Sequence, residues 1–226
     1  MRTRSLQLEI LDTAEVSPET LAAVLADLAR VNVLTRAHAP TLQFLRRMAR
    51  AYPGRRLRVL DVGYGDGDML RRIARWGARA GVALDLTGVD LHPGAAAAAQ
   101  ARSAGYAIVY RTGNVFDEPP GQHDVVISSL FTHHLTDPQI VRFLRWMDAG
   151  AGWFINDLHR HILARDGFSA MAAMAGFHPI VQADGRLSVA RSFRASDWHR
   201  LLAEAGVRGT VAWHMPFRYC VRSCRP

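Results

Sequence analysis

The sequence predicts a single α/β domain built on a doubly wound, mostly parallel sheet, and three observations lead to this prediction. Residues 57–62 form a short apolar run that meets an acid and is followed by three glycines at alternate positions. A second apolar run, residues 84–90, also ends in an acid. Further apolar runs of strand length alternate with segments of helical spacing, which is the pattern of parallel strands joined by crossover helices.

The first strand and the loop after it are the clearest candidate for a ligand site. The strand carries Asp61 near its end, and the loop glycines are Gly63, Gly65 and Gly67. Glycines in such a loop let the chain turn tightly and leave no Cβ atoms to block a ligand. Helical spacing in residues 69–76 places a helix N-terminus, with its unpaired amide groups, against the loop. The segment therefore predicts a site for a nucleoside cofactor.

Two other nucleotide-binding patterns fit this loop less well. The dinucleotide fingerprint needs a third glycine at position 68, where Asp68 stands, and a P-loop needs a lysine, which the sequence lacks altogether. The loop instead resembles motif I of the class I S-adenosylmethionine (SAM) dependent methyltransferases. This resemblance implies a Rossmann-like fold and SAM as cofactor. The matching cofactor-binding residues are Asp61, Gly63, Gly65 and Gly67.

A second acid follows Asp61 after 29 residues, at the end of the second strand. Adjacent parallel strands end side by side, so Asp90 is expected beside the glycine loop, where its carboxylate can accept hydrogen bonds from both ribose hydroxyls. Leu91 next to it is assigned to the same cofactor site. The alternative is that Asp90 caps the helix that starts near Pro93.

The third strand, residues 107–110, leads to a glycine at position 113. In the family that the sequence resembles, the residue after this glycine is often an acid that binds the adenine amino group, with an apolar neighbour against the ring. Asn114 and Val115 occupy these positions, and the Asn114 carbonyl oxygen can still accept a hydrogen bond. The alternative is that Asn114 turns a loop.

The fourth strand, residues 124–130, is expected to end where the methyl donor meets its acceptor. Ser129 is assigned to the cofactor and Phe131 to the acceptor. The segment lacks the Asn/Asp-Pro-Pro-aromatic pattern that DNA and protein amino-methyltransferases often carry here, which argues against an exocyclic base amine as acceptor.

Two adjacent histidines follow this strand, and imidazole can take a proton from a phenol or another weak acid near neutral pH. Neighbouring side chains diverge, so one histidine is expected to face the cofactor and the other to pack or to be solvated. His134 is the expected general base, by resemblance to small-molecule methyltransferases with a His-His-Leu segment here. The alternatives are His133 as the base and a purely structural pair.

The fifth strand, residues 152–158, also ends in polar residues. Asn156, Asp157 and Arg160 are expected to line the acceptor pocket or to fix a lid by hydrogen bonds. His159 and His161 with Asp157 could also be metal ligands. No fourth ligand follows at a motif spacing, so no metal is expected.

An excursion of about residues 160–192 follows, and residues 162–177 in it have a helical, Met-, Ala- and Phe-rich sequence. Methionine adapts to irregular apolar ligands, so Met171 and Met174 are expected to belong to a lid over an aromatic or acyl substrate, with ordinary helix packing as the alternative. Ser196 and Asp197 are expected to cap the next helix. Residues 207–214 and 217–222 predict a closing antiparallel hairpin, which resembles the end of a methyltransferase sheet.

Residues 1–54 are expected to form a helical cap of the same domain, ahead of a methyltransferase domain at residues 55–226. Residues 18–30 and 39–51 have helical patterns, and such helices often cap the cofactor cleft in the family that the sequence resembles. Arg36, at their junction, is assigned to the SAM carboxylate, with solvent exposure as the alternative.

Composition limits the remaining choices. The 226 residues are 49% hydrophobic, which is enough for one domain to bury a full core. The sequence has no run of eighteen apolar residues, and its first residues lack the apolar region of a signal peptide, so a cytoplasmic protein without a membrane span is expected. Cys220 and Cys224 have a spacing that fits neither a zinc knuckle nor a disulfide-rich scaffold. The net charge of +8 would favour nucleic acid as a partner, but the arginines are spread over the whole chain.

The sequence therefore predicts a SAM-dependent methyltransferase that acts on a small, aromatic, hydroxylated acceptor in secondary metabolism, by O- or C-methylation. Residues 130–135 and 156–160 resemble bacterial methyltransferases of the ubiquinone and menaquinone type, some of which are associated with polyketide synthases. The resemblance implies an aromatic or polyketide-derived acceptor; a homodimer is one option for the oligomeric state.

Two functions of other classes stay open at this point. One is an RNA methyltransferase or RNA-binding homologue, which would use the basic charge. The other is an aminopropyltransferase, which would use decarboxylated SAM. That family has a catalytic acid after the fourth strand, where Ser128 and Ser129 stand here.

Overall fold

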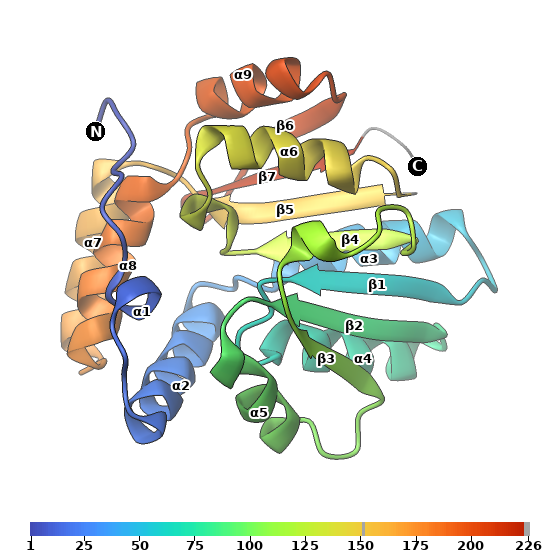
Figure 1. The fold of residues 1–226 in the computed structure, drawn as a ribbon, viewed down its shortest axis with the longest axis horizontal. Helices are drawn as coiled ribbons and strands as arrows, with labels where there is room; N and C mark the ends of the chain where they lie inside the picture. Colours follow the sequence, from blue (N-terminus) through green and yellow to red (C-terminus); the bar gives the residue numbers. More distant parts are fainter. Residues whose placement is uncertain (151, 224–226) are drawn as a thin grey trace.

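The computed structural model describes residues 1–150 and 152–223 and contains, in these ranges, a sheet with the strand order β3-β2-β1-β4-β5-β7-β6 (Figure 1). Strands β1 to β5 pair in parallel, and β7 is antiparallel to both of its neighbours. The predicted fold, a mostly parallel sheet with an antiparallel C-terminal hairpin, is confirmed. The strands are β1 (Leu57–Val62), β2 (Leu84–Asp90), β3 (Ile108–Thr112), β4 (Val125–Ser129), β5 (Gly152–Leu158), β6 (Gly209–His214) and β7 (Arg218–Ser223).

Helices cover both faces of the sheet. One core cluster joins the sheet to α6 and α9, and a second joins it to α3, α4 and α5. The helices are α1 (Ile10–Thr13), α2 (Pro18–Leu34), α3 (Ala39–Ala51), α4 (Asp68–Ala80), α5 (Pro93–Arg102), α6 (Asp137–Met147), α7 (Ile162–Met174), α8 (Pro179–Arg191) and α9 (Ala195–Ala205), with 3-10 turns η1 (Val115–Asp117) and η2 (Thr132–His134).

The central strands are apolar on both faces because each face is covered. In β1, Leu60 and Val62 pack into the cluster with α6 and α9, whereas Leu57 and Val59 pack into the cluster with α3 and α4. This two-sided burial explains the nearly continuous apolar run that the sequence shows here.

A third group of helices faces the end of the sheet at which the parallel strands finish. Figure 1 shows the arrowheads of β1 and β4 pointing toward α2, α7 and α8. These helices share a small core of their own, made of Val24, Val31, Ala172, Phe177 and Val181. The N-terminal segment runs along α8, where the Ser5 amide donates to the Ala190 carbonyl at 3.0 Å.

Several predicted boundaries need correction. The helix predicted over 162–177 ends at Met174, because Gly176 turns the chain with a φ of 62° and α8 follows as a separate helix. The N-cap residue of helix α9 is Arg194, not Ser196. The Arg194 amide donates to Asp197 Oδ2 at 2.8 Å, so Asp197 takes part in the cap as predicted. Helices α1 and α6 were not predicted, and α8 lies within the predicted helical excursion of about residues 160–192 without having been predicted as a separate helix.

Two other expectations concern the end of the chain and membranes. Cys220 is buried on β7, and Cys224 lies outside the described residues. In the part of the chain that the structure describes, no helix combines the length and the apolar character that a membrane crossing requires.

Candidate functional site

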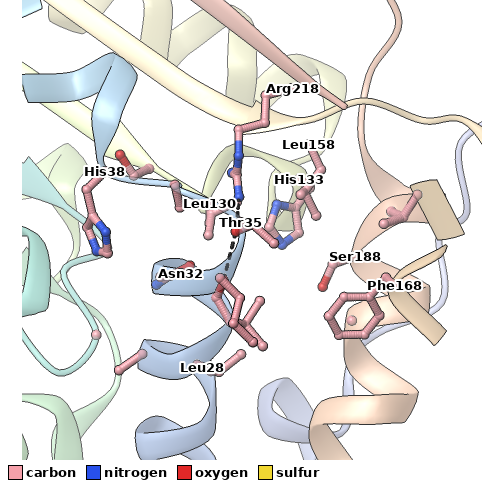
Figure 2. A pocket seen from close by; sticks show the side chains of 18 of the residues that line it. Leu28, Asn32, Thr35, His38, Leu130, His133, Leu158, Phe168, Ser188 and Arg218 are labelled. Carbon is pink, nitrogen blue, oxygen red and sulfur yellow. Dashed lines mark hydrogen bonds between the residues drawn. The ribbon is translucent and has the colours of Figure 1, made fainter. Parts of the chain in front are cut away.

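A cavity of about 540 Å³ lies at the C-terminal ends of the parallel strands, between the sheet and helices α2, α7 and α8 (Figure 2). Its size falls within the range of small-molecule sites. One wall is polar and consists of the glycine loop, the end of β4 and the turn η2. The opposite wall is apolar and includes Leu25, Leu28, Leu163, Phe168, Met171 and Val189.

Asp90 lies beside the glycine loop, as predicted. Its Oδ2 accepts from the Gly65 amide at 2.9 Å, and its Oδ1 accepts from the His92 amide at 2.9 Å. The cap of α5 is His92, whose Nδ1 accepts from the Gly94 amide at 3.1 Å, so Asp90 is not the cap. The Asp90 carboxylate is thus held at the loop by two backbone donors.

The three loop glycines have left-handed backbones for different reasons. A Cβ atom on Gly65, at φ 56°, would meet nothing within 4 Å, so this glycine leaves space open on the loop. A Cβ on Gly63 would lie 2.7 Å from the Phe131 ring, and one on Gly67 would lie 2.4 Å from the Tyr110 hydroxyl. Gly63 and Gly65 line the cavity, whereas Gly67 makes room for packing behind it.

The residues assigned to the nucleoside half lie at the ends of β2 and β3, outside the cavity lining. The Gly113 amide donates to the Asp90 carbonyl at 2.9 Å, which places the start of this loop next to Asp90. Asn114 Oδ1 accepts from the Phe116 amide at 3.0 Å and caps η1, so the loop-turning alternative describes what this side chain does here. Val115 is buried in the core, and Leu91 is 71% exposed.

Asp61 is a buried carboxylate at the cavity wall. Desolvation raises the pKa of Asp61 well above its usual value, and the negative charge of Asp90 adds to this effect. Such a group is stabilised by a positively charged ligand group. Ser129, also in the wall, forms a hydrogen bond between its Oγ and Thr41 Oγ1 at 3.1 Å.

His38, rather than Arg36, comes from the N-terminal helices to the cavity wall. Its Nε2 lies 2.7 Å from Asp68 Oδ2, which joins the helix after the glycine loop to the segment between α2 and α3. Burial alone would raise the pKa of Asp68, but the hydrogen bond and charge of His38, together with Arg72, lower it to about 2. The side chain of Arg36 is exposed and is not part of the cavity lining.

Asp157 holds the imidazole of His133 in a fixed orientation. The fully buried carboxylate lies 2.7 Å from His133 Nδ1 and accepts from the His133 amide at 2.9 Å, the Leu158 amide at 2.7 Å and the Thr132 hydroxyl. Burial raises the pKa of Asp157, but His133 and these donors outweigh it and lower the pKa to about 2. The opposite nitrogen, His133 Nε2, lies 3.7 Å from Glu9 Oε1, and His133 lines the cavity.

His134 has a similar arrangement with different partners. Its Nδ1 lies 3.1 Å from Asp12 Oδ1, its Nε2 lies 3.8 Å from Glu9 Oε2, and its side chain is 29% exposed. The two rings are 4.4 Å apart between centroids, and both histidines line the cavity. The expectation that one of them turns away from the site is wrong, because carboxylates from the N-terminal segment draw the second ring to the same side.

Glu9 is a buried site residue for which the sequence pattern gave no signal. Its Oε1 accepts from the Ser188 hydroxyl at 2.9 Å, and burial raises its pKa to about 7. Among the described residues, Glu9, His133 and His134 are the group that could hold a metal ion, since their ligand atoms lie within 4.8 Å of one another. The other combination considered for a metal does not form, because the Asp157 carboxylate is directed to His133.

The variant Glu9→Gln is expected to be more stable than the wild type above pH 7. The pKa of Glu9 rises from 4.5 to about 7 on folding, so ionisation of this carboxyl destabilises the fold as the pH rises through that interval. The difference in unfolding free energy should grow from near zero at pH 4.5 to about 3 kcal/mol at pH 8. Urea unfolding of both proteins across this range measures it, with the exposed Glu15→Gln as control. A difference that does not change with pH would contradict the expectation.

Several residues assigned to the acceptor lie outside the cavity and support its walls. Asn156 Nδ2 donates to the Ala37 carbonyl at 2.7 Å and so fixes the segment before α3. Arg160 pairs with Asp197 at 2.9 Å and donates to the Ser192 carbonyl at 3.4 Å, which fixes the end of the α7–α8 excursion. Phe131 packs under Gly63, and Met174 is 83% exposed, whereas Met171 lines the cavity as expected.

Comparison with known proteins agrees with this geometry. Residues 59–150 match the family model described as a methyltransferase domain. A search of curated proteins finds no match. The chain resembles the solved plantazolicin methyltransferase BamL, crystallised with S-adenosylhomocysteine (SAH) and a triazolic desmethylPZN analogue, at 16% identity and a TM-score of 0.65, over 86% of this chain and 72% of that one.

Two further structures show how widely this fold is shared. Magnesium protoporphyrin IX methyltransferase from Synechocystis PCC 6803, also with SAH, is 14% identical with a TM-score of 0.54, over 92% of this chain and 88% of that one. The CMeT domain of the citrinin polyketide synthase is 16% identical with a TM-score of 0.55, over 75% of this chain and 46% of that one. At these identities the likeness concerns the fold.

Proposed function

We propose that the chain is a class I SAM-dependent methyltransferase and that it methylates a small, largely apolar acceptor at a weakly acidic oxygen or carbon, with His133 as the proton acceptor. The observation that carries this proposal is the buried pair of His133, which lines the cavity, and Asp157, which lies behind it. His133 follows β4 and Asp157 lies near the end of β5, at the end of the sheet where ligands bind in open α/β folds.

The residues around the glycine loop fit SAM. Gly65 leaves open space, Asp90 presents a fixed carboxylate for the ribose hydroxyls, and the buried Asp61 is suited to a positively charged group such as the methionine ammonium. When bound, SAM supplies an electrophilic methyl group on a positively charged sulfur. Four further residues at the C-terminal ends of β2, β3 and β4 are proposed as cofactor contacts: Leu91, Asn114, Val115 and Ser129.

The role of the histidine pair follows from its hydrogen bonds. Asp157 accepts from Nδ1 of His133 and so leaves Nε2 with a lone pair toward the cavity. In the proposed reaction Nε2 takes the proton from the acceptor, and the adjacent Asp157 stabilises the imidazolium that forms. The geometry favours His133 over His134, because His133 is the more deeply buried and is held by an ionised carboxylate with a pKa of about 2.

The apolar wall opposite the histidines supports a small apolar acceptor. Leu28 of α2, Phe168 and Met171 of α7 and Val189 of α8 offer contacts to an aromatic or acyl body. Structures with this fold include methyltransferases named for a peptide natural product, a porphyrin and a polyketide, which agrees with an acceptor of small-molecule type. An aromatic or polyketide-derived acceptor in secondary metabolism is therefore the proposed substrate class.

A panel experiment tests this function. The purified enzyme is incubated with SAM and with phenols, resorcinols, β-ketoacyl compounds or total RNA, and products are detected by mass spectrometry. We expect methylation of a phenol or a β-dicarbonyl compound together with release of one SAH per methyl group, and no SAH release without acceptor. Methylation of RNA, with none of any small compound, would contradict the proposal and favour the nucleic-acid alternative.

A further inference from the structure

Arg218, the first residue of β7, has a buried guanidinium group at the wall of the cavity. Its residue surface is 2% exposed, and its Nη2 donates to Thr35 Oγ1 at 3.0 Å. Its Nε and Nη1 atoms are buried without a hydrogen-bond partner in the described part of the chain. Figure 2 shows the side chain reaching from β7 toward Thr35, between Leu130 and His133.

The guanidinium also lacks a counter-charge of its own. Within residues 1–150 and 152–223 it forms no ion pair, and desolvation lowers its pKa. The negative charge of Asp157 acts against this lowering of the pKa of Arg218. Its carboxylate, however, is already bound to His133 Nδ1, to two backbone amides and to the Thr132 hydroxyl. A buried cation without a paired anion destabilises the fold, and Arg presents several N–H donors in a planar arrangement that suits a carboxylate. The site is therefore complementary to a negatively charged ligand group.

The position of Arg218 in the sheet assigns this group to the acceptor. Strand β7 is three steps from β1 in the strand order, which is roughly 14 Å at the usual strand spacing. Asp61 belongs to β1 and the glycine loop follows this strand, whereas Arg218 pairs with Leu158, the neighbour of Asp157. The backbone of Arg218 thus lies three strands from the strand that carries the glycine loop, next to Leu158, and its side chain reaches from there toward Thr35 beside His133.

We propose that Arg218 binds a carboxylate of the acceptor. This inference rests on the proposed function and adds the substrate class: an amphiphilic acid, whose apolar body contacts α2, α7 and α8 and whose carboxylate pairs with Nε and Nη1 of Arg218. Such a ligand would fill the apolar wall and neutralise the buried charge at the same time. It would also place a fixed anchor next to His133, which would position the reacting atom.

Equilibrium binding tests the proposal without turnover. Calorimetry on the SAH-loaded protein compares decanoate with decan-1-ol, and 3-phenylpropionate with 3-phenylpropan-1-ol. In the wild type, at least one acid is expected to bind about ten times more tightly than its alcohol. Arg218→Gln should remove this preference, whereas Arg56→Gln, which removes the same charge from an exposed site before β1, should keep it.

Two results would overturn the proposal. One is equal affinity of acid and alcohol in both pairs for the wild-type protein, which needs no variant and so holds even if Arg218→Gln does not fold. The other is a folded Arg218→Gln protein that keeps the preference for the acid but binds SAH more weakly, since the guanidinium would then serve the methionine carboxylate. Failure of the proposed function would be seen separately, as absence of methyl transfer in the panel assay.

Discussion

His133→Ala is expected to lower kcat by about 10² to 10⁴ while the affinity for SAM changes by less than about twofold. The reason is that Asp157 directs Nε2 of His133 at the cavity, so the variant loses the group that takes the proton but not the residues of the glycine loop. Asp157→Asn should cause a loss of the same order, because an amide does not stabilise the imidazolium as a carboxylate does. Single-turnover methyl transfer and SAH calorimetry measure the two quantities.

The controls for this prediction separate three roles of the imidazoles. His134→Ala is the matched variant, and a larger loss there than in His133→Ala would exchange the roles of the two histidines. An acceptor that is already ionised at the assay pH should lose little rate in either variant. If a chelator abolished activity and a divalent ion restored it, Glu9, His133 and His134 would be metal ligands rather than proton acceptors.

The fold and the geometry of the glycine loop could be predicted because they depend on short stretches of sequence. The period and length of the apolar runs indicate strands that are buried on both faces of a parallel sheet. Asp61 and Asp90 could be placed close together because they stand at the same end of two adjacent parallel strands. The space at Gly65 is likewise a local property. Gly67 shows the limit of such reasoning, since its neighbour Tyr110 comes from another strand.

The other half of the site could not be predicted, because its residues meet through long-range packing. Glu9 and Asp12 approach His134 across more than 120 residues of sequence, and nothing in their own segment indicates a site. Asn156 and Arg160 were expected near the acceptor because they lie close to the end of β5, but each binds a neighbouring segment instead. Arg218 follows a turn near the end of the chain, where an arginine is usually solvated.

A second large effect is expected at the cofactor loop, where Asp90→Ala should weaken SAH binding by about 10- to 150-fold. This range corresponds to a loss of about 1.5 to 3 kcal/mol, the usual value for hydrogen bonds to a charged group. Asp90 is half-buried and accepts two backbone N–H groups, so its removal should leave the core of the sheet intact. Calorimetry with SAH on the folded variant measures the loss, and an unchanged affinity would remove Asp90 from the cofactor site.

Gly65→Val should abolish detectable SAH binding, because the branched side chain would fill the open space on the loop. The substitution also strains a backbone with a φ of 56°, so its effect on stability must be separated from its effect on binding. Gly54→Val is the matched control for backbone strain. The φ of Gly54 is 72° and a Cβ there also meets nothing within 4 Å, but Gly54 precedes β1, at the opposite end of the sheet from the loop. Both variants should lose about 1 to 2 kcal/mol of unfolding free energy. If Gly54→Val and Gly65→Val bound SAH equally well, the open space at Gly65 would not belong to the cofactor, and the assignment of the loop would fail.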